Sequence, residues 1–241
     1  MGQRRKVISM MSFLIQYRLY FLLAIPTLFG YFWISHFKEK LRIKEWVAFV
    51  LSVLNTIFGV LFVKLFAFLE TGGEGGMSLY GGIFFLPVVY FAFAKISKRS
   101  VADVFDIFAI CTICTVLCAR FNCILAGCCL GNHIPGTEAM RWPTRELEII
   151  FYLVLFILLR KKVCKKKYSG LIYPIYMMSY GAFRFIVEFF RESDRVLGFI
   201  HVSHIWSLIA VVGSIIAIYL IKKYNTNEKP KSKHKRLLKG G

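Results

Sequence analysis

Apolar runs follow one another along almost the whole chain, and most are long enough to cross the roughly 30 Å hydrocarbon core of a bilayer. Seven can be distinguished, at 12–35, 46–69, 78–94, 102–118, 147–160, 171–190 and 202–221. A backbone that crosses lipid must satisfy its own hydrogen-bonding groups, as a helix does. We therefore expect an all-α, polytopic integral membrane protein with about seven transmembrane helices, forming a single transmembrane domain over 1–241.

The formal net charge of +19 is distributed in a way that predicts topology rather than nucleic-acid binding. Lysines and arginines gather in alternate loops and at the C-terminus, at 38–44, 95–99, 160–167 and 222–241. Basic loops of multi-pass proteins face the cytoplasm, and such charges also attract anionic lipid. We expect 222–241 to be a basic cytoplasmic tail and no nucleic acid to bind. The loops expected to be extracytoplasmic are 70–77, 119–146 and 191–201.

The N-terminus does not fit this scheme simply, because residues 1–6 are basic although seven spans place them outside. Either these residues lie along the membrane interface or the number of spans differs by one. The first apolar run lacks a small-residue cleavage site after it, so it is not expected to be a removed signal peptide.

Ionisable side chains inside a membrane span are costly and indicate a functional site by default. Arg184, Glu188 and Arg191 stand at i, i+4 and i+7 in an otherwise aromatic and aliphatic stretch. One helix face would therefore carry a positive, a negative and a positive charge. A purely structural Arg184–Glu188 ion pair is the competing interpretation. This stripe is the strongest functional signal in the chain.

Two further ionisable residues, Arg120 and Glu148, border apolar runs on the same predicted side. Arg120 has no acidic neighbour in sequence, so it requires a carboxylate or a ligand anion, and its planar fork suits a phosphate. The alternative is that Arg120 extends to the lipid headgroups. Thr144, between Pro143 and Glu146, predicts a helix start that carries Glu148 into the membrane.

Small residues and histidines offer weaker signals on this side. Gly81 and Gly82 follow Tyr80 at the start of the third run, where glycine permits either close approach of a ligand or tight helix packing. His201 and His204 lie one helical turn apart at the start of the last run. We expect the two histidines to contact headgroups or to hydrogen-bond within the bundle.

Six of the seven cysteines fall in two groups of three. The membrane trio, on one predicted helix face, is Cys111, Cys114 and Cys118. The outer trio, in a predicted outer loop, is Cys123, Cys128 and Cys129. The membrane trio is expected to pack as small apolar residues, and a disulfide within the outer trio is compatible with an oxidising compartment. The outer trio with His133 approximates a zinc-binding pattern only loosely, so no metal is expected.

Four segments, 78–82, 119–127, 142–148 and 180–194, carry the residues singled out above. In order and spacing they resemble motifs of the bacterial prolipoprotein diacylglyceryl transferase family. The last (YGAFRFIVEFFRESD) is similar to the late motif of that family nearly position for position, and the first (SLYGG) to an early segment in which histidine usually precedes two glycines. The second resembles the signature Gly-Arg-x-Gly-Asn-Phe-x-Asn-Gly-Glu, and the third a His-Pro-Ser-Gln-Leu-Tyr-Glu stretch. Family members have seven spans and a cytoplasmic C-terminus, as expected here.

The chain departs from the family motifs at three positions. Tyr80 stands where a histidine is usual, Cys123 replaces an asparagine, and Cys128 replaces a glutamate. The retained residues are Arg120, Gly127, Glu148, Arg184, Glu188 and Arg191. The anion-binding half of the site is therefore kept better than the acid–base half, which indicates a divergent member.

The resemblance implies a bacterial plasma-membrane enzyme with its active site on the extracytoplasmic face. The reaction transfers the diacylglyceryl group of phosphatidylglycerol to the thiol of the lipobox cysteine in precursor proteins, and releases glycerol 1-phosphate without a cofactor. The implied catalytic residues are Arg184, Glu188, Arg120 and Tyr80. The implied substrate-binding residues are Gly81, Gly82, Gly127, Arg145, Glu148 and Arg191. The arginines would stabilise the charge on the displaced phosphate, and Glu188 or Tyr80 would relay the thiol proton.

Two other functions account for parts of the sequence. A membrane thiol–disulfide oxidoreductase would use the outer trio, but it gives no role to Arg184 and Glu188. A non-enzymatic transporter of an anionic lipid or solute would use the arginines, but no internal repeat of the kind common in transporters is present.

Overall fold

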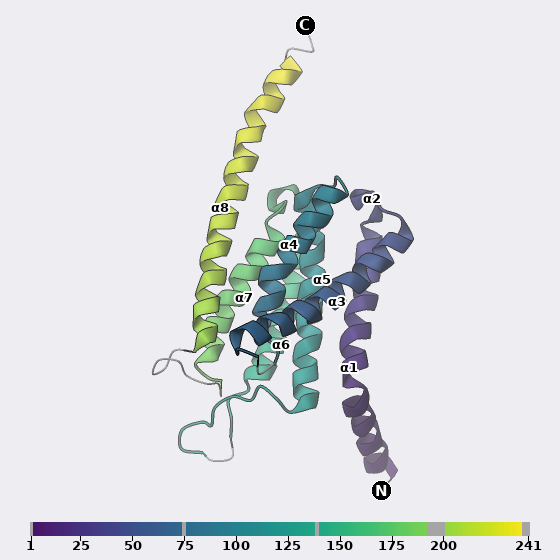
Figure 1. Ribbon diagram of the computed structural model, residues 1–241, viewed down its shortest axis with the longest axis vertical. Helices are drawn as coiled ribbons and strands as arrows, with labels where there is room; N and C mark the ends of the chain where they lie inside the picture. The colour runs from purple at the N-terminus through teal and green to yellow at the C-terminus, as the bar shows by residue number, and fades with distance from the viewer. Residues whose placement is uncertain (1, 74–75, 138–139, 192–200, 238–241) are drawn as a thin grey trace.

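The computed structural model describes residues 2–73, 76–137, 140–191 and 201–237, with side chains described for 16–226 within these ranges. Its long helices, shown in Figure 1, are α1 (Gly2–His36), α3 (Glu45–Glu70), α4 (Tyr80–Ile96), α5 (Val101–Ala126), α6 (Thr144–Arg160), α7 (Ile172–Glu188) and α8 (Val202–Leu237). A four-residue helix α2 (Lys38–Leu41) and a 3-10 turn η1 (Lys166–Tyr168) lie in connections. Across the described ranges no strand is formed. Each of the seven predicted runs is helical.

The helices fall into two classes of length. Four segments are long and apolar enough to cross a membrane by themselves: Gln16–His36, Glu45–Glu70, Val101–Ala126 and Val202–Thr226. The helices α4, α6 and α7 have 17 residues each. At about 1.5 Å per residue they reach roughly 26 Å, close to the minimum for a span. The chain is an all-helical, multi-pass membrane protein.

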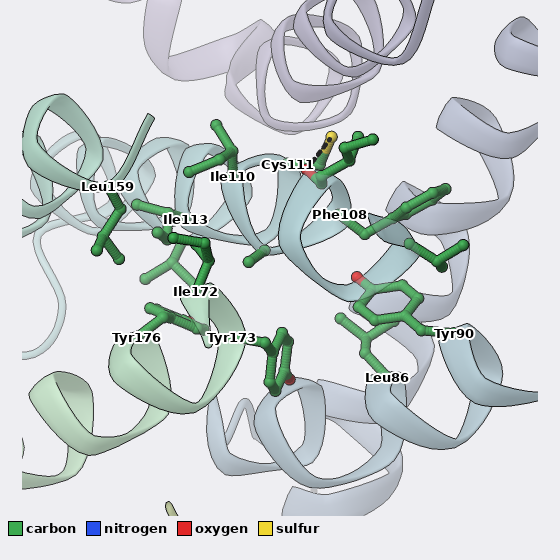
Figure 2. Close-up of a cluster of buried hydrophobic side chains, with 14 of the residues drawn as sticks. Leu86, Tyr90, Phe108, Ile110, Cys111, Ile113, Leu159, Ile172, Tyr173 and Tyr176 are labelled. Atoms are coloured by element: carbon green, nitrogen blue, oxygen red, sulfur yellow. Dashed lines mark hydrogen bonds between the residues drawn. The ribbon is translucent and has the colours of Figure 1, made fainter. Parts of the chain in front are cut away.

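Helix α5 occupies the centre of the bundle and contacts α1, α3, α4, α6 and α7. More than half of its most apolar stretch, 56%, is buried, against 22–28% for the other three long spans. Figure 2 shows the core that results, with Tyr90 of α4 near Phe108 of α5 and Tyr173 of α7, and with Leu159 of α6 on the other side of the cluster beside Ile113 and Ile172. Tyr90 also donates a hydrogen bond to Asn55 Oδ1 at 2.6 Å. Helices α1 and α8 lie at opposite edges of the bundle.

The prediction that the fourth span ends at residue 118 was wrong, because α5 continues to Ala126 and the following connection begins at Gly127. The acidic residues near its start are satisfied by neighbouring elements. Asp106 accepts hydrogen bonds from the backbone N–H groups of Gly170 (2.8 Å) and Ile172 (3.0 Å), at the start of α7. These carboxylate contacts satisfy donors that a helix N-terminus leaves without intrahelical partners.

The two ends of the bundle differ in charge. The connections at 37–44, 97–100 and 161–171 lie at the upper end of Figure 1, and they contain most of the basic loop residues. The ends of α5 and α7 and the starts of α6 and α8 lie at the lower end. Helix α1 also starts there and continues without a break from Gly2. Side chains of 227–237, and residues 238–241 altogether, lie outside the description, so the predicted basic tail is only partly covered.

Candidate active site

Three helix ends converge at the lower end of the bundle and bring four ionisable side chains together. Arg120 comes from the last turns of α5, Glu148 from the first turns of α6, and Arg184 and Glu188 from the last turns of α7. Their exposed fractions are 5%, 1%, 6% and 1%. Burial of Arg120 contradicts the alternative in which it extends to the headgroups. The predicted helix start at Thr144 is confirmed, and it places Glu148 one turn into the bundle.

Glu148 is the centre of this cluster. Its Oε2 lies 2.6 Å from Arg120 Nε, and its Oε1 accepts a hydrogen bond from Arg184 Nη1 at 2.9 Å. Arg191 Nη1 lies 3.7 Å from the same Oε1. Buried charges are tolerated only when they are paired and hydrogen-bonded, so Glu148 allows three guanidinium groups to share one site. The carboxylate that Arg120 required is supplied by another helix.

Glu188 is the second acid of the cluster. Its Oε2 lies 2.7 Å from Arg184 Nη2, which confirms the predicted i,i+4 contact. Arg191 does not continue the same helix face, because α7 ends at Glu188, but the chain beyond the helix still directs Arg191 toward Glu148. The buried imidazole of His201 also approaches Glu188, with Nδ1 3.7 Å from Oε1.

His201 is a site residue that sequence reasoning missed. The sequence separates it from Glu188 by a connection and offers no spacing rule that would pair them. The expected hydrogen bond within the bundle does exist, since the His201 backbone N–H donates to His204 Nδ1 at 3.0 Å. The only signal for a site role was the presence of two histidines at the start of an apolar run.

The cluster has an excess of positive charge. Among its described arginine and glutamate side chains, three guanidinium groups face two carboxylates, which gives an excess of one (3 − 2 = +1). A thiolate at Cys129, whose charge interacts with Arg191 and Arg120, balances this excess in the absence of a ligand. Arg120 and Arg184 are almost wholly shielded from water, so an anionic ligand that reached them would interact with them strongly. Guanidinium groups bind carboxylate or phosphate oxygens through paired N–H donors.

A cavity of about 400 Å³ opens beside the cluster. Arg120, Arg184 and Arg191 line one part of it, and Asn55 and Thr112 lie at its far side, near the middle of α3 and α5. The walls between are mostly aliphatic side chains of α1, α3 and α4, namely Leu22, Val60, Val63, Ile83 and Leu86. The arrangement joins a polar, positively charged mouth to an apolar interior, as an anionic amphiphile requires.

Tyr80 lines this cavity but directs its hydroxyl toward α8. The hydroxyl donates a hydrogen bond to the Ser203 carbonyl oxygen at 2.9 Å and lies 2.6 Å from Ser207 Oγ. The ring packs edge-on against Tyr180, with centroids 5.5 Å apart. Tyr80 is therefore held in place by α7 and α8, with its proton engaged by the backbone.

The two predicted glycines have different surroundings. A Cβ atom on Gly81 would lie 2.0 Å from the Phe62 carbonyl oxygen, so this glycine permits the close contact between α3 and α4. A Cβ atom on Gly82 would meet nothing nearer than 3.7 Å, and Gly82 lines the cavity. The packing interpretation thus applies to Gly81, and closeness to a ligand is available only to Gly82.

Gly127 ends α5 with a turn that needs a positive φ. Its φ is +65°, and its N–H donates to the Ile124 carbonyl while the N–H of Cys128 donates to the Cys123 carbonyl, both at 3.2 Å. This pair of hydrogen bonds is the Schellman motif, in which glycine adopts the left-handed conformation at no steric cost. The motif folds Cys128 and Cys129 back toward Cys123.

The outer trio is brought together by this turn. The three sulfur atoms lie within 4.8 Å of one another, all three residues line the cavity, and all three are free thiols. The pKa of the Cys129 thiol is lowered to about 4 by a hydrogen bond with Cys123, against the opposing effect of burial, and the charges of Arg191 and Arg120 lower it further. In the membrane trio, Cys111 and Cys114 are buried in the core as expected.

Arg145 does not join the cluster. Its guanidinium lies 3.6 Å from Glu146 Oε1, an acid whose side chain is 46% exposed. Both residues are in the first turn of α6, and Arg145 pairs with this exposed acid rather than with Glu148. Of the charged residues implied by the family motifs, Arg145 is the one that the structure places outside the cluster.

Comparison with known proteins agrees with these motifs. The sequence pattern of the prolipoprotein diacylglyceryl transferase family matches residues 10–220. The chain is 30% identical over 189 residues to the phosphatidylglycerol–prolipoprotein diacylglyceryl transferase of Pseudoalteromonas translucida, covering 68% of this chain and 71% of that protein. The proteins of the same name from Chlorobaculum tepidum and Mannheimia succiniciproducens are 29% and 32% identical over 142 and 148 residues. These alignments cover 54% and 57% of this chain, and 49% and 55% of the relatives.

Proposed function

The chain belongs to the prolipoprotein diacylglyceryl transferase family, and we propose that it transfers the diacylglyceryl group of phosphatidylglycerol to the lipobox cysteine of precursor proteins. The substrates are those in the names of its relatives. Those names favour neither a thiol–disulfide oxidoreductase nor a transporter.

One observation carries this proposal: three arginines gathered around the buried Glu148 line one end of a largely apolar cavity. The phosphodiester of phosphatidylglycerol carries a single negative charge, and its acyl chains are apolar. The cluster suits the phosphate, while the aliphatic walls suit the start of an acyl chain. The distance along α5 from Arg120 to Thr112 is about 12 Å at 1.5 Å per residue, which gives the cavity its depth.

In the reaction, the thiolate of the acceptor attacks the glycerol carbon that bears the phosphate. A C–S bond forms as the C–O bond breaks, and the bonding electron pair leaves on the phosphate oxygen of glycerol 1-phosphate. Negative charge grows on that oxygen in the transition state, so Arg184 and Arg120 stabilise the transition state more than the ground state. Glu148 positions both guanidinium groups, and Arg191, held at 3.7 Å, contacts the departing headgroup.

The thiol proton needs an acceptor close to the cluster. Glu188 lines the cavity, so we assign it as the acceptor of the thiol proton. His201 lies next to Glu188 and would be the second residue of this proton relay. The contact with Arg184 stabilises the charged carboxylate and makes Glu188 a weak base. The Tyr80 hydroxyl donates to the backbone of α8, so its role is to hold the wall of the cavity. Gly82 leaves room for the lipid, and Gly127 shapes the turn beside it.

The orientation follows from loop charge. The basic connections lie at the end of the bundle opposite the cluster. Because basic loops remain in the cytoplasm, the cluster faces the extracytoplasmic side of the bacterial plasma membrane and the C-terminus is cytoplasmic. A precursor emerging from the membrane would then present its cysteine on the side of the site, and phosphatidylglycerol would enter sideways from the lipid.

The test is a transfer assay with purified protein, phosphatidylglycerol labelled in the diacylglyceryl part, and a lipobox peptide. Wild-type protein should label the peptide cysteine. Arg184→Ala should reduce the rate by about 10²–10³-fold, as removal of a transition-state donor does. Arg145→Ala is the matched control, because this arginine lies outside the cluster, and it should change the rate only a few-fold. Equal losses in the two variants would refute the assignment of the cluster.

A further inference from the structure

The outer trio is a group of soft metal ligands that the proposed reaction does not use. Cys123 lies on the last turn of α5, and the Schellman motif at Gly127 returns Cys128 and Cys129 to it. The three sulfur atoms lie within 4.8 Å of one another. Cys128 is exposed and the other two are half-buried, so the group is open on one side.

We propose that Cys123, Cys128 and Cys129 bind a Zn²⁺ ion whose fourth position is open to the cavity and takes the acceptor cysteine as a thiolate. The second half of this statement rests on the proposed function. The ion is thus both a new ligand of this chain and the group that prepares the acceptor for attack.

The geometry suits such an ion. Zn–S bonds of about 2.3 Å in a tetrahedral site place sulfur atoms roughly 3.8 Å apart. Sulfur atoms already within 4.8 Å reach that separation by small side-chain rotations. Three protein ligands with an open fourth position are the arrangement of catalytic rather than structural zinc sites. All three cysteines line the cavity that Arg120 and Arg184 also line, so a fourth ligand would meet the bound lipid there.

The chemistry supplies what the cluster lacks. Coordination to Zn²⁺ favours the deprotonated thiol, so the acceptor R–SH becomes metal-bound R–S⁻ and its proton passes to Glu188. The bound sulfur attacks the glycerol carbon, the C–O bond breaks, and the electron pair leaves on the phosphate. The product is a neutral thioether, a poorer ligand than a thiolate, so it leaves the ion. The ion is neither oxidised nor reduced.

This arrangement accounts for two features of the chain at once. The Tyr80 hydroxyl is bonded to the backbone of α8, and Glu188 is held by Arg184, so neither is a strong base. A metal that activates the thiol reduces the base strength required. It also gives a role to three cysteines that stand around one turn beside the arginines.

The first measurement is metal binding to the reduced, metal-free protein in detergent, with Co²⁺ as the spectroscopic probe and Zn²⁺ as competitor. We expect one ion per chain, with thiolate-to-cobalt charge-transfer absorption that Zn²⁺ abolishes. Cys128→Ser and Cys129→Ser should each weaken Co²⁺ binding by more than about 100-fold. Cys164→Ser, which replaces an exposed cysteine at the basic end, should bind as the wild type does.

The second measurement adds a lipobox peptide to the cobalt-loaded protein without lipid. The cysteine peptide should increase the charge-transfer absorption, and a peptide with serine in its place should not. This readout needs no transfer, so failure of the proposed function would leave it intact. Conversely, transfer that proceeds at an unchanged rate in metal-free protein would overturn the inference and leave the proposed function standing.

Two results of the binding measurement would also overturn the inference. One is the absence of Co²⁺ and Zn²⁺ binding although the three thiols remain reactive to alkylation. The other is a disulfide within the outer trio in protein isolated without reductant that re-forms after reduction and reoxidation, because a disulfide removes two of the ligands.

Discussion

Replacing Glu148 by glutamine tests the electrostatic balance of the buried cluster. The substitution keeps the shape of the side chain but removes the charge that Arg120 and Arg184 contact at 2.6 and 2.9 Å. Three guanidinium groups would then face one carboxylate, and the formal excess would rise from +1 to +2 (3 − 1 = 2). Loss of one partner of a buried ion pair costs about 3–5 kcal/mol, because the remaining charge is left uncompensated. The free energy of unfolding should fall by that amount in a denaturant titration in detergent.

Glu146→Gln is the matched control, two residues away on the same helix. Glu146 is 46% exposed and lies 3.6 Å from Arg145, so its loss should cost about 0–1 kcal/mol. The double variant Glu148→Gln/Arg120→Gln returns the formal excess to +1 (2 − 1), and it should recover part of the loss. Equal losses for the Glu148 and Glu146 variants, within about 0.5 kcal/mol, would refute the role of Glu148 as the buried counter-ion.

Two further predictions concern the surroundings of the cluster. Gly81→Ala should lower the free energy of unfolding by about 1–3 kcal/mol or prevent assembly of the bundle, because its Cβ would meet the α3 backbone. Gly82→Ala should be neutral or slightly stabilising, because its Cβ meets nothing so close. Similar effects of the two substitutions would contradict the packing described. In reduced, metal-free protein, Cys129 with its pKa of about 4 should be alkylated nearly as fast at pH 6 as at pH 8, because it is already the thiolate, while an ordinary thiol is under about 1% thiolate at pH 6. A rate that rises tenfold per pH unit over that range would rule out a lowered pKa.

The helices could be predicted from the sequence because length and hydropathy are local properties of each run. The C-terminal end of α5, at Ala126, could not. Asp106 and Arg120 look like polar boundaries of a span, yet each is satisfied by a partner on another helix, the start of α7 for Asp106 and Glu148 of α6 for Arg120. Such pairings depend on how helices pack, and a single helix sequence does not contain them.

The site, too, could be predicted only where a contact depends on spacing within one helix. The Arg184–Glu188 contact follows from i,i+4 spacing, and it was predicted correctly. The central place of Glu148 depends on three helix ends meeting, and the approach of His201 depends on where α8 begins. The spacing of the outer trio argued against a metal site, but the turn at Gly127 gathers the three thiols in a way that ligand spacing alone does not reveal.

The central claim is that the arginine–glutamate cluster drives displacement of a phosphate by a thiol, and a double-label measurement tests it most directly. Phosphatidylglycerol labelled separately in its diacylglyceryl part and in its headgroup would be incubated with protein and a lipobox peptide. We predict that the wild-type protein forms equal molar amounts of peptide thioether and glycerol 1-phosphate. Both products should be lost together in Arg184→Ala. Both should be partly retained in Arg184→Lys, because lysine keeps the positive charge but not the planar fork of donors. Release of headgroup without label on the peptide, or transfer unaffected by either substitution, would contradict the account.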